Sequence, residues 1–413
     1  MRVPQELVHL IVDNLHDDIP SLESCSLTAR SFVSSAQTYL FNKVEILPPK
    51  NRDDPNSPCR KFHKLLTSSP HIAPLVDELE IVLVGSETSF AYDEDGDYLE
   101  ERHVPWVMSG RTLSLVLSLL DLKRISLVEN SPSEWNDVGE FSMSWNRLGR
   151  SLKAALTAVF SSPKLKSVRL RGIVVESPAQ LLSLFSEATS LREMSIARVR
   201  FTQRWNELTP WPDFQPWHPQ LQSLLVSEVD SDHFCRYFLH PRIDLTHIKS
   251  LTIATELNEY RERLAQAAIS AATQHLAIYR PHWTETTFKS ILTSNLRSMN
   301  FFSTDLLRLL PDVFAACAQN NSRLEKLVFE AGTYAFKPEL LSHHIDARIE
   351  SAVAHLSALK SVEIKAFLWA DDDVPFPVWA LSVRNALPSL VGRGLLTLTE
   401  IKRAYENPHY GWE

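Results

Sequence analysis

Glycine and cysteine are scarce in this chain of 413 residues, which contains only ten glycines and four cysteines. The sequence has no glycine-rich loop that would cradle a phosphate, and it contains neither HExxH nor GxSxG. No two cysteines form a CxxC pair, so neither a zinc knuckle nor a disulfide framework is predicted, and a reducing compartment fits best. We therefore expect a protein that is not an enzyme and that holds no metal or cofactor.

Runs of basic residues and long apolar stretches are missing as well. Lys+Arg number 42 against 50 for Asp+Glu, which gives a formal net charge of 42 − 50 = −8, and no run of five basic residues occurs. The longest apolar stretch, residues 113–122, is interrupted by Ser114 and Ser118 and is shorter than the ~20 residues that cross a bilayer. The N-terminus lacks the pattern of a signal peptide. We expect a cytoplasmic or nuclear protein that binds neither nucleic acid nor a membrane.

Two groups of residues resemble metal sites only superficially. The acidic run 93–97 would need calcium ligands at Ala91 and Arg102 in the register of a calcium loop, so a solvated loop is the better interpretation. Cys59 and His63 are four residues apart, but no second pair at ligand spacing completes a tetrahedral site. Structural roles are favoured for both groups.

The strongest signal is a recurring pattern of the form apolar-x-x-apolar-x-apolar, whose last three positions predict a strand with one buried face. The middle positions are separated by 46, 43, 26, 30, 27, 25, 23, 28 and 35 residues. Ten such triplets occur: Val76/Leu79/Ile81, Leu122/Ile125/Leu127, Leu165/Val168/Leu170, Leu191/Met194/Ile196, Leu221/Leu224/Val226, Ile248/Leu251/Ile253, Thr273/Leu276/Ile278, Leu296/Met299/Phe301, Leu324/Leu327/Phe329 and Leu359/Val362/Ile364.

Segments with helical spacing alternate with these triplets, for example 148–159, 179–187, 257–273, 286–292 and 306–318. This succession resembles the leucine-rich-repeat family from about residue 76 to residue 364, although the Asn or Cys that usually follows the strand is mostly missing. Residues 387–398 are predicted to form a terminal cap, which a solenoid needs at its open end. Residues 371–377, three aspartates before a proline-bracketed stretch, predict a surface loop.

The first forty-odd residues follow a different pattern, which predicts three short helices before a possible strand at Val44 and Ile46. Pro4 suits the first turn of a helix in which apolar residues recur every four positions, and Ser21 is expected to cap the second helix. Helices of this length make a poor independent core, so apolar surface is expected to remain for a partner or a following domain.

The segment 3–8, followed by Ile11, Leu15 and the stretch 25–32 (CSLTARSF), resembles the F-box-like motif of mushroom-forming fungi. The resemblance covers about residues 1–46, and an F-box followed by repeats is a common order in that family. It implies a substrate receptor that docks on the Skp adaptor of a cullin ubiquitin ligase and holds a client protein with its repeats. The candidate adaptor-binding residues are Pro4, Leu7, Ile11, Leu15, Leu22, Cys25, Leu27 and Phe32.

Alternate strand side chains point to opposite faces, so residues between the buried positions should line a concave surface. The candidate client-binding residues are Arg169, Arg171, Tyr279, Phe302, Glu330 and Lys365, with arginines at one end and acids at the other. The Trp/Pro segment 205–219 is expected to be a rigid extended loop that serves either as a plug on the repeats or as a recognition element.

The predicted fold is an α/β solenoid with an F-box-like module at 1–46, degenerate leucine-rich repeats at 47–400 and a tail at 401–413. The first functional hypothesis is the ubiquitin-ligase substrate receptor. The second is a repeat scaffold whose N-terminal helices only cap the solenoid. The third, a hydrolase or transferase on an α/β sheet, would require convergent polar groups that the sequence does not show.

Overall fold

The computed structural model describes residues 4–49, 54, 56–83, 91–92, 98–99, 106–109, 111–129, 143–203, 220–227, 229, 234, 238, 245–254, 273–279, 295–302, 306–320, 323–332, 343–367 and 375–401. Several of the sequence predictions lie wholly or almost wholly outside these residues: the acidic run 93–97, the Trp/Pro segment 205–219, the helices at 257–273 and 286–292, the aspartates 371–373 and the tail beyond Ile401.

The chain divides into two compact units. Unit 1 contains Met1–Leu191 and Val199–Arg204, and unit 2 contains Arg192–Arg198 and Trp205–Glu413. The strands of unit 1 are β1 (Lys43–Ile46), β2 (Glu78–Val82), β5 (Arg124–Val128), β6 (Met143–Ser144) and β7 (Ser167–Val175), with the short pair β3 (Ala91–Tyr92) and β4 (Tyr98–Leu99). Strand β8 (Glu193–Phe201) begins in unit 2 and ends in unit 1. The remaining strands, all in unit 2, are β9 (Ser223–Ser227), β10 (Ser250–Ala254), β11 (His275–Tyr279), β12 (Ser298–Phe302), β13 (Lys326–Gly332), β14 (Ser361–Phe367) and β15 (Leu396–Ile401).

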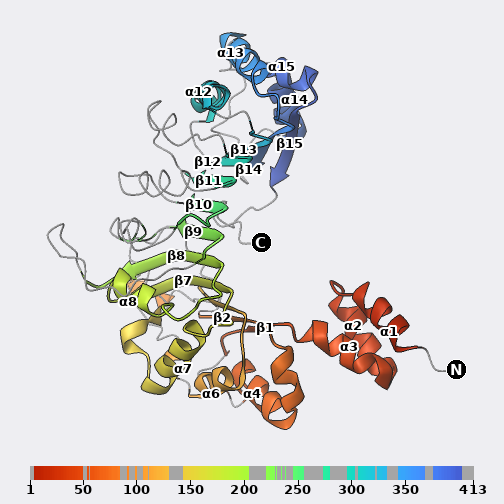
Figure 1. Cartoon of the computed structure of the whole chain (residues 1–413), viewed down its shortest axis with the longest axis vertical. Helices are drawn as coiled ribbons and strands as arrows, with labels where there is room; N and C mark the ends of the chain where they lie inside the picture. Colours follow the sequence, from red (N-terminus) through yellow and green to blue (C-terminus); the bar gives the residue numbers. More distant parts are fainter. Residues whose placement is uncertain are drawn as a thin grey trace. The chain divides into compact units, whose positions relative to one another are not determined.

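Among the described residues, helices lie between several pairs of successive strands (Figure 1). Unit 1 contains α1 (Gln5–Asp13), α2 (Ile19–Thr28), α3 (Arg30–Leu40), α4 (Pro58–Ser68), α5 (Trp106–Ser109), α6 (Thr112–Leu119), α7 (Arg150–Phe160) and α8 (Pro178–Ser183), with 3₁₀ turns η1 (Pro70–Leu75) and η2 (Trp145–Arg147). Unit 2 contains α12 (Leu306–Asn320), α13 (His343–Ala354), α14 (Phe376–Ala386) and α15 (Pro388–Gly392). No helix in the described part of the chain has both the length and the apolar character that a bilayer crossing requires.

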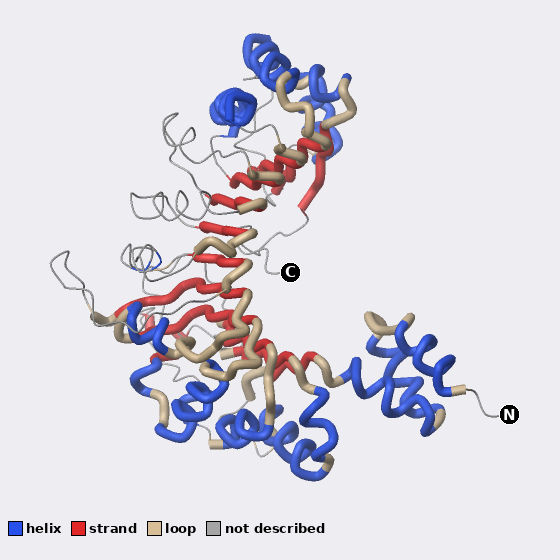
Figure 2. Tube along the Cα trace, viewed as in Figure 1, coloured by secondary structure: helices blue, strands red, loops and turns tan. Residues whose placement is uncertain are grey.

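Apart from the antiparallel pair β3–β4, the strands of each unit are parallel and follow one another in sequence order. Figure 2 shows the strands in red. In unit 1 the order is β1-β2-β5-β7, with β6 beside β7, and in unit 2 it is β8-β9-β10-β11-β12-β13-β14-β15. All ten predicted triplets lead into these strands, and within each unit their middle positions are in register. Leu251, for example, pairs with Leu224 on one side and Leu276 on the other. The predicted repeat is therefore confirmed as a succession of parallel strands.

The apolar positions of the triplets form the core. Leu224, Leu251, Ile253, Leu327 and Ile364 have no measurable exposure. The triplet that contains a polar residue follows the same rule, because Thr273 is fully buried and its Oγ1 donates a hydrogen bond to the carbonyl of Ile248 at 3.2 Å. Burial of this hydroxyl is tolerated because it has found a partner.

Backbone hydrogen bonds join the repeats where each strand begins. The carbonyl of Gln222 accepts the N–H groups of Lys249 and Ser250 at 2.8 and 2.9 Å, and the carbonyl of Lys249 accepts those of Gln274 and His275 in the same way. This arrangement continues through Arg297 and Glu325 to Lys360. Because main-chain groups provide these bonds, the strand starts are satisfied whatever side chain stands there, and the degenerate sequence does not break the register.

One sequence prediction at the C-terminal end is wrong. Residues 375–377 do not belong to a surface loop, because Pro375 is the N-cap of α14 while Phe376 and Pro377 form its first turn. Proline is tolerated there because the first N–H groups of a helix have no partner within it. In the predicted cap, residues 396–398 form the start of β15, which adds one further parallel strand to β14.

Candidate partner-docking surface

The N-terminal helices α1, α2 and α3 pack around a small core. Val12, Leu22 and Ala36, one from each helix, are fully buried. Leu15, Phe32, Tyr39 and Leu40 pack against them. Each helix thus contributes its own apolar side chains, as the spacing predicts.

Polar contacts fix the helices to one another. The Tyr39 hydroxyl donates to Asp13 Oδ1 at 2.7 Å, which raises the pKa of Tyr39, and Ser35 Oγ is 2.9 Å from His9 Nδ1. The second helix begins earlier than predicted, because Asp18 and not Ser21 is its N-cap. Asp18 accepts the N–H of Ser21 at 3.1 Å and its hydroxyl at 2.6 Å, and these bonds lower the pKa of Asp18.

Large apolar side chains remain on the outer faces of α1 and α2. Leu7, Leu10 and Ile11 are 49, 57 and 45% exposed, while Ile19 is 47% and Leu27 88% exposed. Leu7, Leu10 and Ile11 are spaced i, i+3, i+4, so they share one face of α1, and Val8 and Val12 occupy the buried face. We call these five exposed residues the apolar face of the module.

The structure divides the candidate adaptor-binding residues into two groups. Pro4, Leu7, Ile11 and Leu27 are exposed and are available to a partner. Leu22 is fully buried, so in this structure it supports the module from inside and is not available as a contact. Leu15 and Phe32 are partly buried and pack against the same core, and their assignment as contacts stays a prediction. Cys25 is intermediate in exposure.

Sequence reasoning also missed two members of the apolar face, Leu10 and Ile19. The apolar spacing alone could not select them, because α1 has apolar residues on two adjacent faces and only packing decides which one is buried. The early cap at Asp18 was the available signal for Ile19, since it places this residue in the first turn of α2.

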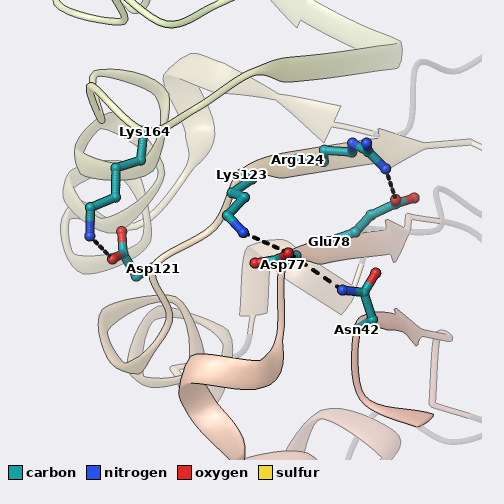
Figure 3. A network of polar contacts seen from close by, with 7 residues as sticks. All are labelled: Asn42, Asp77, Glu78, Asp121, Lys123, Arg124 and Lys164. Atoms are coloured by element: carbon teal, nitrogen blue, oxygen red, sulfur yellow. Dashed lines mark hydrogen bonds and ion pairs between the residues drawn. The ribbon is translucent and has the colours of Figure 1, made fainter. Parts of the chain in front are cut away.

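The module is bound to the first repeat through Asn42, just after α3. The carbonyl of Asn42 accepts the N–H groups of Asp77 and Glu78 at 3.0 and 2.9 Å. Figure 3 shows the side-chain contacts beside this junction, in which Asn42 Nδ2 donates to Asp77 Oδ2 at 3.4 Å and Lys123 binds the same oxygen at 2.8 Å. Arg124 contacts Glu78 at 3.4 Å, and Lys164 pairs with Asp121. These ion pairs neutralise the carboxylates of Asp77, Glu78 and Asp121, near the starts of β2 and β5.

The candidate client-binding residues lie on the strands as predicted, but their charges are mostly occupied. In unit 2, Tyr279, Phe302, Glu330 and Lys365 are paired in register on neighbouring strands. Glu330 is only 6% exposed, accepts a hydrogen bond from Asn300 Nδ2 at 2.9 Å and contacts Lys365 at 3.3 Å. The side chains of Tyr279 and Phe302 lie outside the described residues.

At the predicted acidic end of this surface, both acids are paired with lysines. Glu330 is neutralised by Lys365, and Glu363 on β14 is neutralised by Lys326 at 2.9 Å. In unit 1, Arg169 and Arg171 lie on β7 and are both partly buried. Burial lowers the pKa of Arg169, with Arg171 acting in the same direction and the charges of Glu80 and Glu78 opposing it.

Comparisons with known proteins add little to this geometry. No family model matches the chain, and no curated protein does. Among solved structures, the leucine-rich repeat-containing protein LegL7 from Legionella pneumophila is similar at 12% identity with a TM-score of 0.40, over 85% of this chain and 98% of that chain. The chain is therefore a repeat protein of parallel strands and helices with an N-terminal helical module.

Proposed function

We propose that the chain is a non-catalytic substrate-recognition subunit of a Skp/cullin/F-box ubiquitin ligase that acts in the cytoplasm or nucleus. In this role α1 to α3 dock on the Skp adaptor, and the repeats bind the client protein. The apolar face carries the proposal. Its five side chains are close to half exposed or more, whereas Val12, Leu22 and Ala36 are fully buried in the core of the module.

The energetics of such a face favour a bound partner. Burying one Leu or Ile side chain that was exposed contributes about 1.5–3 kcal/mol, and interface anchors of this kind cost about 2 kcal/mol or more when they are removed. Leu7 and Ile11 are four residues apart and therefore lie next to each other on one face of α1. Together they are suited to a groove between two helices of a partner. The F-box-like sequence motif at 3–32 indicates which partner offers that groove.

The direct test is co-purification with a Skp adaptor, comparing the wild-type chain with Leu7→Asp/Ile11→Asp. We expect the wild type to bind and the double variant to lose at least about 100-fold in affinity, since two anchors are replaced by charges. Leu381→Asp is the matched control, because Leu381 is 57% exposed on α14, far along the chain from the module. Leu22 is unsuitable, because an Asp in the core would unfold the helices.

A second candidate function is a repeat scaffold whose N-terminal helices only cap the first strand. The hydrogen bonds from Asp77 and Glu78 to the Asn42 carbonyl favour it, because they join the end of the module to the first repeat. Failure of the folded wild type to bind the adaptor would support this scaffold. If the variant bound as well as the wild type, docking through the apolar face would be excluded.

A further inference from the structure

The strand starts of unit 2 bring together side chains that are 20–40 residues apart in the sequence. The residue immediately before each strand contributes one side chain to a row that crosses these neighbouring strands. We call five of these residues the strand-start stripe: Arg192, Gln222, Lys249, Gln274 and Arg297. Their order is fixed, because each carbonyl accepts N–H groups from the next member at 2.7–2.8 Å.

Cations and amides alternate along this stripe. Neighbouring strands are about 4.8 Å apart, so successive cations are about 9.6 Å apart. Lys249 and Arg297 are exposed, and Gln222 is exposed between the first two cations.

The positive charge here is only partly balanced. Arg297 contacts Glu325 at 3.7 Å, but the same carboxylate binds Lys360 at 2.5 Å, so one acid serves two bases. Their side chains are 56 and 74% exposed. The edge is thus basic in a chain whose net charge is −8, which sets it apart from the paired strand starts of unit 1.

We propose that the strand-start stripe of unit 2 binds an extended acidic peptide segment that carries a carboxylate at every third residue. In a polyproline II conformation the rise is about 3.1 Å and every third side chain returns to the same side, at about 9.3 Å. This repeat matches the spacing of the cations. The amide groups of Gln222 and Gln274 lie between the cations and are suited to hydrogen bonds with the peptide backbone.

The site differs from the concave face that the sequence predicts, and it does not depend on the adaptor. Its recognition is electrostatic, so high salt weakens it. A uniformly acidic peptide is repelled by the chain as a whole, and binding therefore requires the local stripe. A search for clustered arginines in the sequence could not find it, because only the repeat register brings these positions together.

The test uses the purified full chain without any adaptor, so its outcome is separate from that of the docking proposal. Fluorescence anisotropy would measure the binding of a labelled peptide of repeated Glu-Pro-Pro. A second peptide would have the same composition with all glutamates in one block. We expect the spaced peptide to bind more tightly than the blocked one, and binding to weaken at high salt.

The double variant Lys249→Gln/Arg297→Gln should bind the spaced peptide about tenfold more weakly, since each exposed pair contributes about 0.2–1 kcal/mol. The double variant does not leave the Glu325 carboxylate without a base, because Glu325 still contacts Lys360. Arg393→Gln, which removes an exposed charge from the C-cap of α15, is the matched control and should bind normally. Equal binding of the two peptides, an unchanged double variant, or tighter binding of a single-stranded oligonucleotide than of the spaced peptide would each overturn the proposal.

Discussion

Gly172 in β7 is the residue whose identity is most tightly constrained by its own backbone. Its φ is +73°, in the left-handed region that side chains with a Cβ rarely adopt. A Cβ at this position would lie 2.3 Å from Glu129 Oε2 and 2.6 Å from the Cβ of Glu129, which is itself buried. Conformation and space therefore both require glycine.

We predict that Gly172→Ala lowers the free energy of unfolding by about 2 kcal/mol or more. The left-handed conformation costs about 1–2 kcal/mol with a Cβ, and overpacking against Glu129 adds to it. Chemical denaturation measures the loss. Gly149→Ala is the control, because nothing lies within 4 Å of its Cβ position and its φ is −59°. Equal losses in the two variants would show that neither cause operates.

At the scale of elements, the last strands of unit 2 are held together by a charged side chain between neighbours. Glu363 on β14 contacts Lys326 of β13 at 2.9 Å and accepts a hydrogen bond from Thr399 of β15 at 3.0 Å. Burial raises the pKa of Glu363, but the hydrogen bonds from Lys326 and Thr399 and the charges of Lys326 and Lys365 outweigh it and hold the pKa below the ordinary value of a glutamate. The ionised form is thus favoured in the folded state.

The lowered pKa of Glu363 predicts how the free energy of unfolding changes with pH. Because the folded pKa is lower than the unfolded one, the stabilisation is complete above pH 4.5 and is lost as the pH falls through the folded value. Glu363→Gln should cost about 1–2 kcal/mol at pH 7 and much less at acid pH. Denaturation at both pH values tests this, with Glu350→Gln on the exposed face of α13 as the control. A cost that did not change with pH would contradict it.

At the scale of the whole molecule, each unit has its own core. Leu156 on α7 belongs to unit 1 and Phe314 on α12 to unit 2, and they are 1 and 0% exposed. Phe314 packs on Phe329, which stacks on Phe301 at 5.6 Å. In repeat proteins, stability is the sum of local terms between neighbours, so distant repeats unfold separately when a weak point lies between them.

We predict two unfolding transitions, one for each unit. Leu156→Ala should destabilise unit 1 by about 2–5 kcal/mol, and Phe314→Ala should destabilise unit 2 by about 3–5 kcal/mol. Hydrogen exchange with mass spectrometry in increasing denaturant assigns each transition to its peptides. If either variant moved both transitions equally, the two units would unfold as one.

Most of the strands could be predicted from the sequence because the burial of alternate residues has a short and local signature. The triplets marked ten of the strands, and Val44 with Ile46 marked β1, whereas β15 and the short strands β3, β4 and β6 were not predicted. Helices α4, α13 and α14 were not predicted from the sequence, because their apolar residues are irregularly spaced or because prolines stand at the helix start. Whether Leu22 or Leu7 faces outward could not be predicted either, because both belong to apolar helical stripes.

The sequence by itself determined most of the parallel strands and their order, the three N-terminal helices and the general acidity of the chain. Tertiary structure alone decided which apolar residues of the module stay exposed, that Glu330 is neutralised, and that Lys249 and Arg297 share one edge. The physical reason is that periodicity is carried by near neighbours in the chain. Exposure and charge balance depend instead on residues that only the packing of the repeats brings together.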